Sequence, residues 1–207
     1  MTVRGRNVRG GAAVAPGAAA APDEAALHEA ALRHISRYVT TQAGLIRVLD
    51  RRVARWARAA APDPEVLVGL HAAARRIAAR LTAAGAVDDA AFAAARSVRL
   101  ARAGHSRRAI AAHLAAKGVD GALGRAALPR DDATELAAAL TTLRRRRMGA
   151  FGPAPDAPTR QRQLAVLARA GFEQGLARRA LAMAREEAET LLARTCGGGH
   201  PAEEQFD

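Results

Sequence analysis

The chain of 207 residues contains very few cysteine, lysine and aromatic residues. The single cysteine, Cys196, excludes an internal disulfide and a zinc site built from several cysteines. Aromatic residues make up 3% of the sequence, so any hydrophobic core must be mostly aliphatic. No strongly apolar run reaches the roughly 18 residues typical of a membrane-spanning helix. These absences leave an aliphatic fold without disulfides and without a predicted membrane span.

Residues that could carry out catalysis or hold a metal ion are few and scattered. The six histidines include no pair spaced four residues apart and no His-Glu-x-x-His motif. A phosphate-binding Gly-x-x-x-x-Gly-Lys-Ser/Thr loop is also missing. Asp88 and Asp89 have no third ligand at a useful spacing, which favours helix capping over a metal or acid–base role. We therefore expect no catalytic residue, no metal and no cofactor, and predict that the chain is not an enzyme.

Alanine and arginine are abundant instead, with 57 alanines and 31 arginines against a single lysine, Lys117. Alanine is the strongest helix former, and this abundance predicts an all-α fold. The formal net charge of +12 favours an anionic partner, which could be nucleic acid, an acidic protein face or a membrane surface. Because genome composition alone can enrich alanine and arginine, an individual arginine is weak evidence of a site.

Glycine and proline divide the middle of the chain into helical segments with short connections. We predict nine helices, over residues 24–39, 42–59, 64–84, 89–103, 107–117, 120–128, 132–147, 159–170 and 173–193.

Capping residues agree with these boundaries. Asp88 or Asp89, Ser106, Asp120 and Thr159 are each placed to cap the start of a predicted helix. Two glycines, Gly118 and Gly171, stand where left-handed backbone is needed to end one.

An internal repeat relates two of these regions. Residues 114–128 align with residues 167–181 without a gap, and seven of the fifteen positions are identical. A weaker echo lies earlier, where Thr41, Leu45 and Leu49 keep the spacing of Ser106, Ile110 and Leu114.

Nine helices and three related segments indicate three tandem three-helix repeats, forming an elongated, curved body. We expect a basic disordered arm over 1–22, repeats over 23–86, 87–130 and 131–194, and a disordered tail over 195–207.

The middle of the sequence resembles the RecX family, the bacterial regulators of the recombinase RecA. The resemblance covers about residues 27–190 and is carried by the run from Gly85 to Ala93, by Lys117-Gly118-Val119 and by Leu167-x-x-x-Gly-Phe. The residues that carry the family pattern are Asp88, Asp89, Phe92, Gly104, Ser106, Leu114, Gly118, Gly171 and Phe172. The chain departs from that pattern at Arg96, where the family usually has an aromatic residue, and at Gly44, where it has the glutamate of a capping box.

The resemblance implies a cytoplasmic, monomeric regulator of DNA repair and the SOS response. Such a protein docks in the groove of a RecA–DNA filament and modulates, most often inhibits, recombinase and co-protease activity. Direct contact with single- or double-stranded DNA is a further expectation, and no membrane partner is expected. The candidate partner-binding residues are Arg99, Arg102, Arg107, Arg108, Lys117, Arg125, Arg144, Arg145 and Arg147.

Other interpretations of these residues stay open. The arginine run 144–147 could simply be a solvated helix end that complements the helix dipole. The whole chain could instead be a helix-turn-helix-like protein that acts directly on DNA, although no helix offers a clear cluster of base-reading side chains. A scaffold protein without a link to nucleic acid is a third hypothesis.

Overall fold

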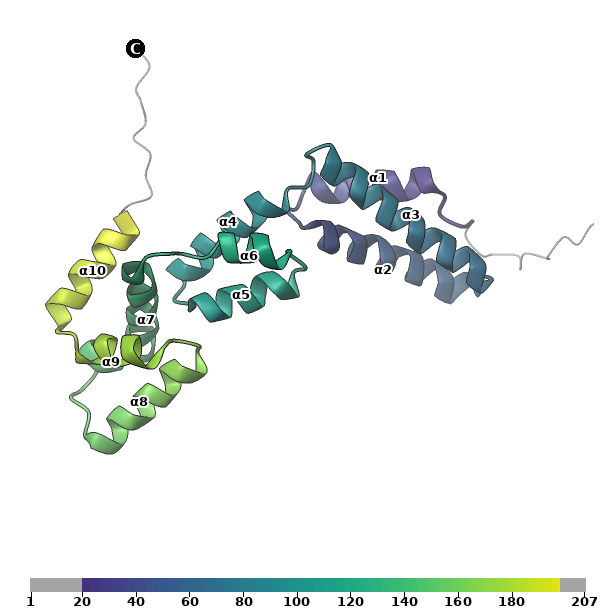
Figure 1. Cartoon of the computed structure of the whole chain (residues 1–207). Helices are drawn as coiled ribbons and strands as arrows, with labels where there is room; N and C mark the ends of the chain where they lie inside the picture. Colours follow the sequence, from purple (N-terminus) through teal and green to yellow (C-terminus); the bar gives the residue numbers. More distant parts are fainter. Residues whose placement is uncertain (1–19, 198–207) are drawn as a thin grey trace, which may run out of the picture. The chain divides into compact units, whose positions relative to one another are not determined.

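The computed structural model describes residues 20–197, and every regular element in that range is helical, which confirms the predicted all-α class (Figure 1). The elements are α1 (Glu24–Ile35), α2 (Gln42–Ala60), α3 (Pro64–Ala83), α4 (Asp89–Arg102), α5 (Arg107–Ala116), α6 (Gly121–Ala126), α7 (Asp132–Arg146), the 3₁₀ turn η1 (Gly149–Phe151), α8 (Ala157–Arg169), α9 (Gln174–Ala182) and α10 (Arg185–Gly197).

The chain forms two compact units. Of the described residues, the first unit comprises 20–38 together with Leu45–Ala86, and the second comprises Val39–Gly44 together with 87–197. The division after Ala86 coincides with the end of the first predicted repeat. The first turn of α2 therefore belongs to the second unit, and the rest of that helix belongs to the first.

The first unit is a three-helix assembly in which α1 packs against α3. Asp63 caps α3 through the backbone N–H of Glu65, with Pro64 in the first turn where a missing N–H costs nothing. The Nδ1 of His71 in α3 lies 2.6 Å from a carboxylate oxygen of Asp50 in α2. The fully buried core side chains of the unit include Leu27, Leu45, Leu49, Val53 and Ile77.

The second unit contains two hydrophobic cores, one under α4–α6 and one under α7–α10. The first core includes Leu100, Ile110, Leu114 and Val119, with Phe92 packed against it and partly buried. The second core includes Leu136, Leu140, Leu143, Leu167 and Phe172. Because aliphatic side chains dominate both cores, the shortage of aromatic residues does not prevent burial.

The last predicted helix, 173–193, is wrong as a single element, because it is divided into α9 and α10. Met183 has extended backbone between them, and it packs against the second core of the unit. Helix α10 then packs along α7. No glycine or proline marks this break, which arises from tertiary packing and from Glu186 and Glu187 in the first turn of α10, where negative charge is favoured.

Several helix ends also differ from the prediction. Helix α1 stops at Ile35 instead of residue 39. Helix α8 begins at Ala157, and its cap is Asp156, whose side chain accepts the backbone N–H of Thr159. Thr159, which was predicted as the cap, is instead the third residue of the helix, in its first turn.

At the C-terminal end, α10 continues to Gly197 and so includes the first three residues of the predicted tail. The predicted arm lies almost entirely outside the described residues, as do tail residues 198–207. The curved arrangement of the three repeats stays a prediction.

Candidate partner-binding surface

Two hydroxyl groups at helix starts make the same pair of hydrogen bonds. The Ser106 hydroxyl accepts the N–H of Ala109, which caps α5, and donates to the carbonyl oxygen of Ala170 at the end of α8, at 2.7 Å. The Thr41 hydroxyl accepts the N–H of Gly44 and donates to the carbonyl oxygen of Lys117 at the end of α5, also at 2.7 Å. Each hydroxyl therefore joins the start of one helix to the end of another.

A carboxylate completes each of these junctions. Asp89 accepts the N–H of Gln42 at 2.8 Å, and Glu135 accepts the N–H of Arg107 through both oxygens, at 3.0 and 3.1 Å. Asp88 caps α4 itself through Ala91. Both aspartates of the Asp88-Asp89 pair therefore act on helix starts, where backbone N–H groups lack intrahelical partners.

The side chain of Arg107 is bound by hydrogen-bond acceptors of the same chain. Its guanidinium donates to the carbonyl oxygen of Asp131 at 2.5 Å and to the Asp132 carboxylate at 3.0 Å. Burial raises the pKa of the neighbouring Glu135 carboxyl, while the backbone N–H and charge of Arg107 act in the opposite direction. Arg107 therefore ties the start of α5 to the start of α7.

Three other candidate arginines near this turn, Arg99, Arg102 and Arg108, are exposed. The first two lie in the last turn of α4, before Gly104, whose positive φ of +88° lets the chain turn. Gly104 packs closely on α7, and its carbonyl oxygen accepts the Thr142 hydroxyl at 2.8 Å. This contact fixes the end of α4 against α7.

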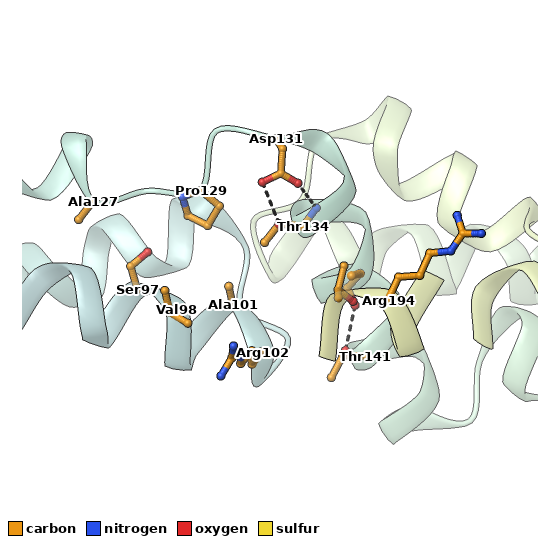
Figure 2. A pocket seen from close by; sticks show the side chains of 12 residues that line it. Ser97, Val98, Ala101, Arg102, Ala127, Pro129, Asp131, Thr134, Thr141 and Arg194 are labelled. Carbon is orange, nitrogen blue, oxygen red and sulfur yellow. Dashed lines mark hydrogen bonds between the residues drawn. The ribbon is translucent and has the colours of Figure 1, made fainter. Parts of the chain in front are cut away.

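A groove of about 410 Å³ runs between α4, α7 and the end of α10 (Figure 2). Small and apolar side chains such as Val98, Ala101 and Pro129 line it, and Arg102 and Arg194 add positive charge. The hydroxyl of Ser97, also on its lining, is buried and has no hydrogen-bond partner in the part of the chain that the structure describes.

A separate hollow of about 480 Å³ has a mixed lining. Arg107, Arg108 and Arg179 face it together with Glu135 and Glu173. The structure therefore does not bring Arg102 and Arg108 into one hollow, although both flank the same turn. The Arg108 side chain passes over Gly171, since a Cβ on that glycine would lie 3.3 Å from Arg108 Cβ and Nε.

The remaining candidates are exposed at helix ends. Lys117 follows the last residue of α5, and Arg125 lies in the last turn of α6. Asp120 caps α6, and its pKa is lowered by the backbone N–H of Ala122, from which its carboxylate accepts a hydrogen bond at 2.8 Å. The predicted caps at Asp120 and Ser106 are therefore confirmed, as is left-handed backbone at Gly118 and Gly171.

The run of four arginines marks the end of α7. Arg144 and Arg145 lie in its last turn, and Arg147 adopts left-handed backbone with a φ of 53° as the helix ends. One Nη of Arg145 approaches the carbonyl oxygen of Ala103 at 3.5 Å. All are exposed, so they can stabilise the negative end of the helix dipole and still meet a partner.

Arg194, which faces the groove, and the arginines of α2 are not among the predicted partner-binding residues. Helical spacing was the signal that could have identified the latter: Arg47, Arg51 and Arg55 recur every four residues, and Arg58 follows three later.

Within residues 20–197, no group of three or more histidine, cysteine or acidic side chains could hold a metal ion. In the same range, no helix combines the length and hydropathy needed to cross a bilayer.

The comparisons with known proteins agree on one family. Residues 88–128, which contain α4–α6, match the family model described as RecX, second three-helix domain. "Regulatory protein RecX" of Myxococcus xanthus is 34% identical over 157 residues, covering 73% of this chain and 82% of that protein. The proteins of the same name from Mycobacterium ulcerans and Mycobacterium marinum are each 44% identical over 108 residues, or 49% of this chain and 60% of theirs.

The matched regions coincide with the structural pattern. The family model begins at Asp88, the cap of α4, and its range contains the core of Leu100, Ile110 and Leu114. The similarity to the Myxococcus xanthus protein covers most of both chains. The chain therefore belongs to the RecX family of regulatory proteins and is not an enzyme.

Proposed function

We propose that this chain binds the RecA–DNA filament as a cytoplasmic monomer and inhibits recombinase and co-protease activity. The observation that carries the proposal is the similarity to "Regulatory protein RecX" over 82% of that protein's length. The family resemblance supplies the partner, and the net charge of +12 suits a filament that contains DNA.

The exposed cations of the second unit are the side chains we assign to filament contact. Arg99, Arg102 and Arg108 lie around the Gly104 turn, and Arg102 also lines the groove of Figure 2. Arginine suits this role because its planar guanidinium can donate two hydrogen bonds to one carboxylate or phosphate. Several such contacts add up along a polymer without a deep pocket.

Arg107 is better explained as a structural residue than as a filament contact. Its guanidinium already donates to Asp131 and Asp132, and its side chain is only partly exposed. A test of the surface should therefore change Arg102 and Arg108 and leave Arg107 intact, so that loss of binding is separated from loss of folding.

Co-sedimentation with RecA tests the proposal directly. The chain should pellet with RecA assembled on single-stranded DNA and nucleotide, and should pellet less with RecA alone. R102Q/R108Q should pellet less than the native chain, while the matched variant R160Q/R162Q, which removes two exposed cations of α8, should change less. A chain that stays in the supernatant with assembled filaments would rule the proposal out.

A further inference from the structure

Helix α2 of the first unit has two opposite faces with different chemistry. One face is buried and carries Leu45, Leu49 and Val53. A position two residues further along a helix lies about 200° around the axis, so the residues two after these point the opposite way. Those residues are arginines, and a fourth arginine extends their row: Arg47, Arg51, Arg55 and Arg58, all exposed.

Three acidic groups of the first unit pair with side chains outside this row. Asp50, the one acid in α2, lies 2.6 Å from His71. Glu29 pairs with Arg33, and Glu24 pairs with both Arg76 and Arg80. Within residues 20–197, Arg51, Arg55 and Arg58 have no ion pair with an acidic side chain.

This spacing places like charges next to one another. Residues three or four apart are neighbours on a helix, so Arg51 and Arg55 repel, as do Arg55 and Arg58. An anionic ligand along the row would remove that repulsion. From Arg51 to Arg58 the row extends about 10 Å along the axis, which is enough to span several phosphates of a duplex.

The side chains around the row favour the DNA backbone over the bases. Between Arg47 and Arg58 there is no asparagine or glutamine, the amides that read adenine edges. The one aromatic residue of α2, Trp56, is partly buried and lies about 140° around the helix from Arg51. The row therefore lacks the aromatic platform on which single-stranded bases stack.

We propose that Arg51, Arg55 and Arg58 form a sequence-independent contact surface for the sugar-phosphate backbone of duplex DNA. This surface goes beyond the proposed function, because it gives the chain affinity for naked duplex DNA in the absence of a recombinase. It also lies on the first unit, whereas the cations assigned to filament contact lie on the second.

Fluorescence anisotropy of the full chain with a labelled mixed-sequence duplex tests the surface over a series of salt concentrations. For R51Q/R55Q/R58Q we expect about tenfold weaker binding at low salt, and a slope of log K against log salt that is shallower by about 2 to 3. R51K/R55K/R58K should keep the native slope because the charges remain. The matched control, R37Q/R52Q/R75Q, removes three exposed cations of the same unit that lie off the row.

Three outcomes would overturn the proposal. Equal losses in R51Q/R55Q/R58Q and in the control would mean that only net charge matters. A larger loss with a labelled oligothymidylate of equal length than with the duplex would assign the row to single strands. Native duplex affinity with lost RecA inhibition would assign the row to an acidic protein face, and would leave the proposed function standing. Circular dichroism of each variant confirms that the helices are intact.

Discussion

The hydroxyl of Ser106 donates a 2.7 Å hydrogen bond to the carbonyl oxygen of Ala170, which joins the start of α5 to the end of α8. The bond from Thr41 to Lys117 repeats this relationship between the start of α2 and the end of α5. In the internal alignment Thr41 corresponds to Ser106, and Lys117 corresponds to Ala170. The junction is thus itself a repeated feature, and it brings the positive end of one helix dipole to the negative end of the next.

We predict that S106A lowers the free energy of unfolding by about 2 kcal/mol, because it removes a helix cap and a second, long-range hydrogen bond. Urea unfolding followed by circular dichroism measures the change. S36A is the matched control, since the Ser36 hydroxyl is exposed and bonds only within its own turn, to Arg33. S106T keeps the hydroxyl that Thr41 uses in the equivalent junction, and it should retain more stability than S106A.

Gly171 should tolerate a side chain poorly. Its φ is +93°, and an added Cβ would lie 2.6 Å from the Ser106 hydroxyl oxygen. G85A is the matched control, because Gly85 also has a positive φ but no atom within 4 Å of an added Cβ. The strain of left-handed backbone costs both variants about 1 kcal/mol, and G171A should lose more. Equal losses would mean that the Ser106 junction can adjust freely.

Combining G171A with S106A should cost less than the sum of the two single changes. The hydroxyl that the new Cβ would meet is absent in the double variant, so the steric part of the penalty disappears. A double-mutant cycle by urea unfolding measures this coupling. Strict additivity would contradict the close contact between Gly171 and Ser106.

Glu135 should make stability depend on pH. Burial raises its pKa above the ordinary value of 4.5, so the folded state binds this proton more tightly than the unfolded state does. Its favourable contribution is therefore present at low pH and is lost as the pH rises from about 4.5 through the raised value. The native chain should lose stability relative to E135Q over that range, since glutamine cannot ionise. A difference that is constant with pH would contradict the raised pKa.

Arg107 and Arg108 should behave differently although they are neighbours. R107Q should lower the free energy of unfolding by about 1 to 2 kcal/mol, because Glu135 loses the nearby guanidinium charge and the start of α7 loses the donor to Asp131 and Asp132. R108Q should leave stability within about 0.5 kcal/mol of native, as expected for an exposed side chain. Thermal unfolding of the two variants measures both effects, and equal destabilisation would contradict the distinction.

Local signals in the sequence predicted much of the fold. The caps at Asp88, Ser106 and Asp120 and the left-handed glycines at Gly118 and Gly171 depend on neighbouring backbone, and all are observed. Such features follow from short-range sterics and hydrogen bonding.

Contacts between distant residues could not be predicted in the same way. The Ser106–Ala170 bond joins residues 64 positions apart. The break after Ala182 carries no glycine or proline; α10 packs on α7 beyond it, and that long-range contact is not visible in the local sequence. Arg107 illustrates the same limit for the site. Its residue type suggested a partner contact, whereas in the fold its guanidinium donates hydrogen bonds to Asp131 and Asp132.

RecA-catalysed DNA strand exchange, measured with increasing amounts of the chain, tests the central claim most directly. We predict that exchange and single-strand-dependent ATP hydrolysis both fall at substoichiometric to near-stoichiometric amounts, and that R102Q/R108Q is a weaker inhibitor than the native chain. Native rates of both reactions in the presence of excess folded chain would contradict the account.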